Sequence, residues 1–339
     1  MSASTSLLNS TRNKIILVVC LTAIILLGIF TPFLRFFFGV FIPYIAIFTF
    51  VIGVVYRIVQ WAKSPVPFSI PTTCGQQKSH PWIKSSFLDN PHNTLGVICR
   101  MALEILFFRS LLKNTSTKLI AGPRIVYGTN ILLWLAGLAF HWCFLLIVIR
   151  HIRFFTDPIP SFVLMLESLD GFLQVGVPVL YMSNIIIVCA LVFLFGRRVV
   201  DPKLRYISLL ADYFPLVLIL LIALTGALMR YTPLKPDIVG VKELSMGLVM
   251  FQPSVPAGIG YIFYIHLFLV CMLISYFPFS KLMHMAGVFM SPTRNQPNNS
   301  RVVRHINPWN YPVKVHTYEE WEDEFRDKMK KAGYPVDKE

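Results

Sequence analysis

Residues 139–155 read AFHWCFLLIVIRHIRFF, an apolar run that carries two histidines and two arginines. Such a run is typical of a membrane-spanning helix, where an ionisable side chain is expensive and marks a candidate functional site. At a rise of about 1.5 Å per residue, the ten residues from His141 to His151 correspond to roughly 15 Å along the helix. We therefore interpret the two histidines as candidate ligands at two levels of one span.

The composition of the whole chain also indicates a membrane protein. Of the 339 residues, 55% are hydrophobic and 14% are charged, whereas about a quarter of the residues in a soluble globular protein are charged. The net charge of +14 does not indicate nucleic-acid binding, because no basic run is interleaved with aromatic residues. The six cysteines form no C-x-x-C pattern, so we expect neither an iron–sulfur cluster nor a covalently attached c-type haem in this chain.

Six apolar stretches are long enough to cross a bilayer as helices. They lie at about 15–34, 38–61, 126–150, 175–196, 208–229 and 258–280. We expect the first to be retained as an extra anchor within residues 1–35, because no small-residue cleavage site follows it. Lys and Arg are concentrated before the first span, after spans two and four and in the tail, which predicts that both termini face the cytoplasm.

The remaining sequence divides into a bundle and a tail. Residues 36–285 form the predicted all-α bundle, which is interrupted by a cytoplasmic loop at about 64–125. Within this loop, residues 94–112 are apolar but carry three charged side chains. A span with these charges would be costly, so we expect an amphipathic helix on the membrane surface.

The cytoplasmic tail, residues 286–339, contains a predicted helix at about 317–332. Thr317 and Glu320 form a capping box at its start, and acidic residues precede basic ones, as the helix dipole favours. One face of this helix is lined by three apolar side chains, Trp321, Phe325 and Met329. We expect the helix to dock on a partner subunit; the alternative is a solvated helix that folds back on its own protein.

The last span carries a second pair of histidines, His266 and His284, which are eighteen residues and about 27 Å apart along a helix. If this span is antiparallel to the span at 126–150, His141 lies at the depth of His284 and His151 at the depth of His266. Each level then holds two neutral imidazoles, as axial ligation of a haem requires. The two spacings differ by about 12 Å, which tilted helices and the position of His284 beyond the span must absorb.

Two arginines adjoin the outer level. Arg150 and Arg153 could pair with haem propionates, and snorkelling to lipid headgroups is their alternative role. No Asp or Glu accompanies the four histidines inside the spans, so a di-iron or zinc carboxylate site is poorly supported. The main alternative function is a proton-coupled transporter that uses the histidines as relays. Such a transporter is expected to show paired repeats or acids within broken helices, and the sequence has neither.

Three stretches carry a resemblance to a known family. Residues 140–151, FHWCFLLIVIRH, and 261–284, YIFYIHLFLVCMLISYFPFSKLMH, resemble the cytochrome b (gamma) subunit of respiratory nitrate reductase in the spacing of their histidines. Residues 36–57, FFFGVFIPYIAIFTFVIGVVYR, resemble the first helix of that family. The resemblance covers about residues 36–285 and implies a polytopic bundle with five helices around two b haems.

This resemblance also implies the metal ligands. His141 and His284 would ligate the haem nearer the cytoplasm, and His151 and His266 would ligate the outer haem. Menaquinol would be oxidised near the outer haem. In nitrate reductase a lysine lies near that site, but the corresponding connection here has none. The quinol-binding residues therefore cannot be carried over.

The tail carries a more specific resemblance. Residues 306–325, INPWNYPVKVHTYEEWEDEF, resemble the membrane cytochrome b subunit of the Dsr/Hme complexes of sulfate-reducing organisms. These complexes are related to heterodisulfide reductase. The resemblance implies an oxidoreductase subunit of the cytoplasmic membrane that passes electrons between menaquinol and a cytoplasmic iron–sulfur subunit, similar to the catalytic subunit of heterodisulfide reductase. It also implies further membrane and periplasmic subunits and a link to sulfate or sulfite reduction.

Overall fold

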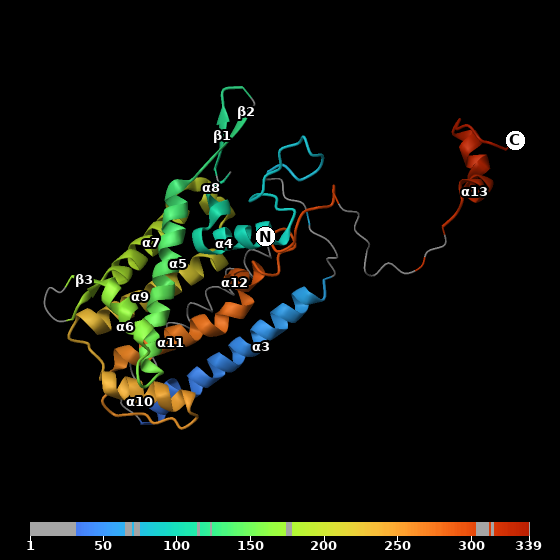
Figure 1. Ribbon diagram of the computed structural model, residues 1–339. Helices are drawn as coiled ribbons and strands as arrows, with labels where there is room; N and C mark the ends of the chain where they lie inside the picture. The colour runs from blue at the N-terminus through green and yellow to red at the C-terminus, as the bar shows by residue number, and fades with distance from the viewer. Residues whose placement is uncertain are drawn as a thin grey trace, which may run out of the picture.

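The computed structural model describes residues 32–64, 70, 75–113, 116–122, 124–173, 178–302, 312 and 315–338. In this part of the chain the fold is a helical bundle with two small antiparallel sheets (Figure 1). Among the described residues, five helices are long and apolar enough to cross a membrane, which confirms the predicted membrane bundle. Most of the span predicted at 15–34, and of the anchor predicted at 1–35, lies outside the described residues; the described end of both belongs to α2, Pro32–Phe36, which continues into the next span.

Each of the five spanning helices packs against at least one other. They are α2 Pro32–Phe36, η1 Phe37–Phe41 and α3 Ile42–Ala62 as one continuous helix, α5 Ile131–His151 with η3 Ile152–Phe154, α7 Met182–Val200, α9 Leu210–Tyr231, and α11 Tyr261–Tyr276 with η4 Phe277–Phe279. Helix α5 packs on α7, α7 on α9, α9 on α11, and α11 on α3. Gly53 allows α3 to approach η4 closely, since a Cβ there would lie 2.6 Å from Cβ of Pro278.

Shorter elements lie between these spans and after the last of them. In chain order they are α4 Thr94–Phe107, η2 Arg109–Leu112, β1 Ser116–Ile120, β2 Arg124–Gly128, α6 Ser161–Asp170, β3 Gly171–Leu173, β4 Leu180–Tyr181, α8 Pro202–Ile207, α10 Ile238–Val249, η5 Lys281–Met283, α12 His284–Gly287 and α13 Tyr318–Lys331. Figure 1 shows α4 lying across the bundle near one end, beside α5, and α6 and α10 at the other end.

The span predicted at 126–150 is wrong at its start. Residues Arg124–Gly128 form strand β2, paired antiparallel with β1, because this stretch is β-branched and aromatic. Helix α5 begins at Ile131, where the Asn130 side chain accepts a hydrogen bond of 3.0 Å from the Leu133 amide. Hydropathy alone misses this boundary because the residues on both sides of it are apolar. The span predicted at 175–196 likewise starts later, since strand β4 precedes α7.

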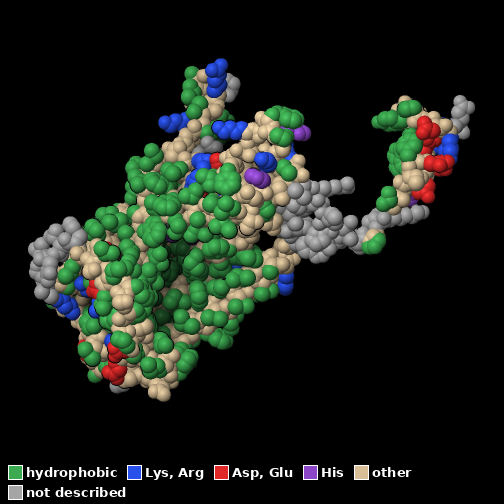
Figure 2. Space-filling view, in the orientation of Figure 1, with side chains coloured by type: hydrophobic (Ala, Val, Ile, Leu, Met, Phe, Trp, Pro, Cys, Tyr) green, Lys and Arg blue, Asp and Glu red, His purple; other side chains and the backbone are tan. Residues whose placement is uncertain are grey.

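The surface of the bundle matches its predicted environment. Figure 2 shows hydrophobic side chains over the sides of the bundle and charged side chains mainly toward its ends. Phe48 on α3, for example, is 68% exposed. A soluble protein rarely leaves an apolar surface of this extent in water, so the sides of these helices face lipid or other subunits.

Helices are present at both positions proposed for cytoplasmic elements. Asn93 begins α4 by accepting a hydrogen bond of 2.8 Å from the Gly96 amide. Thr317 and Glu320 form a reciprocal capping box at the start of α13. Glu322 of α13 is buried, because it accepts hydrogen bonds from backbone amides near the end of the chain. Figure 1 shows α13 apart from the bundle.

Candidate site at two histidine pairs

The first pair, which we call the inner pair, consists of His141 and His284. His141 lies in the middle of α5, and His284 is the first residue of α12. Their ring centroids are 5.9 Å apart, and their ring planes are nearly perpendicular, at 85°. Phe108 and Phe140 each contact the His141 ring edge-on, with centroids 4.9 Å away.

The end of helix α11 and the turns that follow it place His284 beside α5. Helix α11 ends at Tyr276, and two short turns, η4 and η5, follow before α12 begins. Pro278 lies within η4, and the Ser280 hydroxyl accepts a hydrogen bond of 3.1 Å from the Leu282 amide. His284 therefore does not continue the axis of α11. The 12 Å mismatch between the two histidine spacings, which assumes a straight helix, does not arise.

The second pair, which we call the outer pair, consists of His151 and His266. His151 is the last residue of α5, and His266 lies in the first half of α11. Their ring centroids are 6.4 Å apart, and the rings are nearly parallel, at 14°. The structure thus brings together the same two pairs that the antiparallel arrangement predicts.

All four histidines have a hydrogen-bond partner at the same ring nitrogen. The partners of Nδ1 are the Gly137 carbonyl for His141 (2.7 Å), the Ile147 carbonyl for His151 (2.7 Å), the Lys281 carbonyl for His284 (2.9 Å) and the Thr225 hydroxyl for His266 (2.9 Å). An Nδ1–H that donates to an oxygen leaves Nε2 as the nitrogen that can bind a metal. Metal-bound histidines in proteins are commonly held in this way.

The separation of the rings also suits one metal ion between each pair. An imidazole nitrogen lies about 2 Å from the metal that it ligates and about 1 Å from its own ring centroid, so two opposed ligands have centroids about 6 Å apart. The observed values, 5.9 and 6.4 Å, agree with this distance. Figure 2 shows a hollow between the apolar side chains of α5 and α3. His141, His151 and His284 each retain an exposed surface.

The two predicted arginines contact carboxylates on α6. Arg150 is buried, lies 2.8 Å from the Asp170 carboxylate and donates a hydrogen bond of 2.9 Å to Asn184. Asp170 also accepts hydrogen bonds from the Ser183 amide and hydroxyl, at 2.8 and 2.6 Å. Arg153 lies 2.6 Å from Glu167, and 34% of its side chain remains exposed. The sequence places both acids in this connection but does not reveal these ion pairs.

Three residues of the site carry no signal in the sequence. Thr225 lies on α9, whereas His266, which it contacts, lies on α11. Phe108 comes from the loop rather than from a span. Asp170 binds an arginine twenty residues earlier in the chain. None of these contacts follows a helical or strand period, so no sequence pattern could have identified them.

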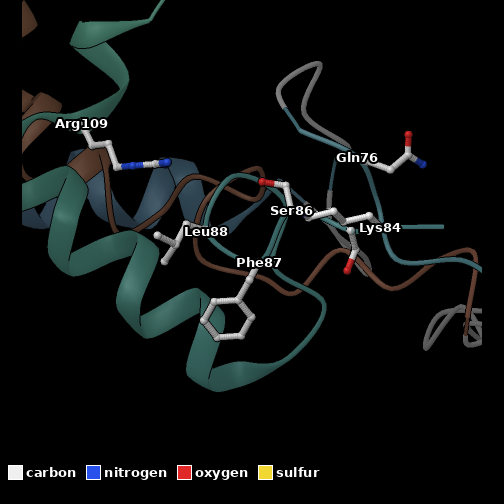
Figure 3. A pocket seen from close by; sticks show the side chains of 7 residues that line it. Gln76, Lys84, Ser86, Phe87, Leu88 and Arg109 are labelled. Carbon is white, nitrogen blue, oxygen red and sulfur yellow. The ribbon is translucent and has the colours of Figure 1, made fainter. Parts of the chain in front are cut away.

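A pocket in the loop is lined by none of the four paired histidines. Its volume is about 530 Å³, and Figure 3 shows Phe87, Leu88 and Arg109 along its wall. Arg109 and Lys113 both pair with Asp89. Burial raises the pKa of the Asp89 carboxyl, but hydrogen bonds from Lys113 and Arg109, together with their charges, outweigh it and lower the pKa to about 2. These ion pairs hold the loop in place. Among the described residues, no group of three or more His, Cys, Asp or Glu could hold a metal ion.

Comparisons with known proteins agree with the resemblance seen in the sequence. The model of the nitrate reductase gamma subunit family matches residues 125–304. An Hdr-like menaquinol oxidoreductase cytochrome b-like subunit of Archaeoglobus fulgidus is 50% identical over 279 residues, which cover 80% of this chain and 83% of that protein. A protein of the same name from Archaeoglobus profundus is 44% identical over 278 residues, which cover 79% of this chain and 81% of that protein. The chain therefore belongs to the nitrate reductase gamma subunit family.

Proposed function

We propose that this protein is the membrane cytochrome b subunit of a menaquinol oxidoreductase complex and holds two b haems. His141 and His284 are the axial ligands of the inner haem, and His151 and His266 are those of the outer haem. The observation that carries this proposal is the pairing of the four imidazoles and their hydrogen bonding. They form two pairs with centroids 5.9 and 6.4 Å apart, and every Nδ1 has an oxygen partner.

A haem at each level would supply one-electron carriers, whose potentials depend on ligands, burial and hydrogen bonds. The protein's own part is to fix the imidazoles and to exclude water with apolar helices. The levels are separated along α5 by ten residues, or roughly 15 Å. Such a pair of sites connects the two surfaces of the membrane.

The names of the two relatives support menaquinol as the substrate and an Hdr-like complex as the assembly. In our proposal, menaquinol is oxidised near the outer haem, and electrons pass from the inner haem to a cytoplasmic iron–sulfur subunit similar to the catalytic subunit of heterodisulfide reductase. Further membrane and periplasmic subunits complete the assembly, which serves sulfate or sulfite reduction. The distribution of Lys and Arg supports a protein of the cytoplasmic membrane with both termini inside the cell.

Of the two arginines proposed for the haem propionates, Arg153 suits this role better. A third of its side chain, 34%, is exposed, so it can bind a further carboxylate while it contacts Glu167. Arg150 is already surrounded by Asp170, Asn184 and the Tyr181 ring, whose centroid lies 3.9 Å from the guanidinium carbon. We therefore propose that Arg150 supports the outer site mainly by holding α6.

The tail helix α13 is proposed as the docking element for the partner subunit. Tyr318 and Trp321 are 54% and 43% exposed, and Trp321 packs on Phe325 with centroids 5.7 Å apart. An isolated helix of this length is marginal in water, and its exposed aromatic side chains suit a protein interface. Helix α4 is proposed to lie at the membrane surface, because Leu95, Ile98 and Ile105 form an exposed apolar stripe along it.

The test of this function is the haem content of the purified protein. We expect two protohaems per chain in a pyridine-haemochrome assay. His141→Ala and His284→Ala should each lower the count to about one and remove the same redox wave; His151→Ala and His266→Ala should remove the other wave. His80→Ala, at an exposed loop residue stacked on Trp82, is the control and should keep both haems.

A folded preparation without haem, from a host that supplies haem in excess, would contradict the proposed function. Such a result would favour the proton-coupled transporter that the intramembrane histidines also permit. Loss of both haems from every histidine variant, with the control intact, would contradict the pairing.

A further inference from the structure

The loop helix α4 is attached to α5 beside the inner pair. The Trp134 indole donates a hydrogen bond of 2.8 Å to the Phe107 carbonyl, and the Trp142 indole donates one of 3.0 Å to the Leu106 carbonyl. Carbonyls in the last turn of a helix lack partners within that helix, so side-chain donors stabilise them. The C-terminal end of α4 is thereby held next to His141.

Directly after α4, the chain adopts an unusual backbone conformation. Phe108 has φ and ψ of 50° and 46°, in the left-handed region, which is sterically unfavourable for a bulky L-residue. The turn is stabilised by Glu104, whose carboxylate accepts hydrogen bonds from the Ser110 amide, at 3.0 Å, and from the Ser110 hydroxyl. Strained residues of this kind persist where the surrounding structure holds them, often at functional sites. Here the turn directs the Phe108 ring at the His141 ring.

The outer pair has a different aromatic neighbour. His151 contacts Phe154, which follows it by one turn on the same helix, with centroids 5.9 Å apart. The outer rings are nearly parallel, at 14°, whereas the inner rings are crossed, at 85°. Among the described ring contacts, Phe108 is the one aromatic residue that reaches a histidine of either pair from outside the helices that carry the pairs.

We propose, on the basis of the two-haem function proposed above, that Phe108 is a positioning residue of the inner site. Its ring holds the His141 imidazole crossed to that of His284. The orientation of axial imidazoles sets the electronic structure of a ferric haem, because crossed rings donate to both iron dπ orbitals and parallel rings donate to one. From the crossed inner rings and the nearly parallel outer rings we expect two different electron paramagnetic resonance signals: a strongly anisotropic inner signal with one large g value, and a rhombic outer signal.

The experiment compares the oxidised wild-type protein with Phe108→Gly. Glycine adopts the left-handed conformation without strain, so this variant removes the ring and preserves the turn. We expect two haems per chain, a shift of the inner signal toward the rhombic form and an unchanged outer signal. The inner haem should also show a more negative midpoint potential, since water that replaces the ring stabilises the oxidised state. Phe154→Leu, at the outer pair, is the matched control and should leave the inner signal unchanged.

A second variant covers the case in which Phe108→Gly does not retain haem. Trp142→Phe removes the hydrogen bond to the Leu106 carbonyl and should shift the inner signal in the same direction by a smaller amount. An inner signal that is unchanged in the haem-loaded variants, or equal shifts of both signals, would overturn the inference. A wild-type protein without any low-spin haem signal would instead defeat the proposed function itself.

Discussion

The inner and outer histidine pairs have similar ring separations, 5.9 and 6.4 Å, but different elements of the chain hold them in place. The outer pair joins two regular helices, with His151 at the end of α5 and His266 within α11. The inner pair joins α5 to a four-residue helix, where His284 follows two short turns, and the loop helix α4 adds Phe108. Similar ring separations can therefore arise from regular helices or from a turn and a loop. The inner pair therefore depends on a turn and on the loop residue Phe108, whereas the outer pair depends on the packing of regular helices, on Thr225 and on the α6 ion pairs.

The largest expected effect concerns the buried ion pair beside the outer pair. Asp170→Asn leaves the buried Arg150 guanidinium without its counter-charge, and breaking one partner of a buried pair costs about 3–5 kcal/mol. We expect a lower thermal midpoint, with loss of the outer haem band before the inner one, followed by absorption spectroscopy during heating. The matched control is Asp157→Asn, because Asp157 is 66% exposed and pairs with Lys242 at 3.3 Å, an interaction worth roughly 1 kcal/mol or less. Equal effects of the two variants would show that the ion pair does not act on the outer site.

A smaller effect is expected from a change at Thr225. Its hydroxyl is the Nδ1 partner of His266, whereas the other three histidines have backbone carbonyls as partners. The Thr225 hydroxyl lies 2.8 Å from the Leu221 carbonyl and can donate to it, so it accepts from Nδ1–H of His266. Thr225→Val keeps the shape and removes the acceptor. Such a change weakens metal binding by about 10–100-fold. In haem titrations we expect this loss at the outer site alone.

Thr225→Ser is the control, because it retains the hydroxyl and should bind both haems as the wild type does. Weaker binding at both sites in Thr225→Val would contradict the assignment of this contact to the outer haem.

The smallest expected effect tests the loop that supports the inner pair. The folded pKa of Asp89, about 2, is below the value of about 3.9 in an unfolded chain. The stabilisation from its ion pairs is therefore fully present above about pH 4 and is lost as the pH falls toward 2. After allowance for solvent screening, it amounts to roughly 1 kcal/mol. The protection factors of the amides of residues 94–113, which correct for the intrinsic pH dependence of exchange, should fall in this pH window in the wild type, and Asp89→Asn should show the lower protection factors already at pH 5. Identical pH profiles for the two proteins would exclude this role.

Much of the fold could be predicted because the bilayer imposes a simple requirement on the sequence. A span needs about twenty apolar residues, which α3, α9 and α11 satisfy near their predicted positions. The prediction failed at Arg124–Gly128, where apolar residues form a strand, since hydropathy does not distinguish an apolar strand from the start of a span. It also treated His266 and His284 as points on one straight axis, because no sequence rule specified how far the chain turns after Pro278.

Hydropathy and the helical rise are local properties of the chain, so the amino-acid pattern was enough to predict the membrane class, the main helices and the spacing of His141 and His151 along α5. The packing of the helices, by contrast, decided which ring centroids lie 5.9 and 6.4 Å apart, which oxygen contacts each Nδ1, and that Arg150 contacts Asp170. It also decided that Phe108, from a loop, contacts His141. These contacts depend on how separate helices pack and turn, and packing between distant segments leaves no period in a single sequence.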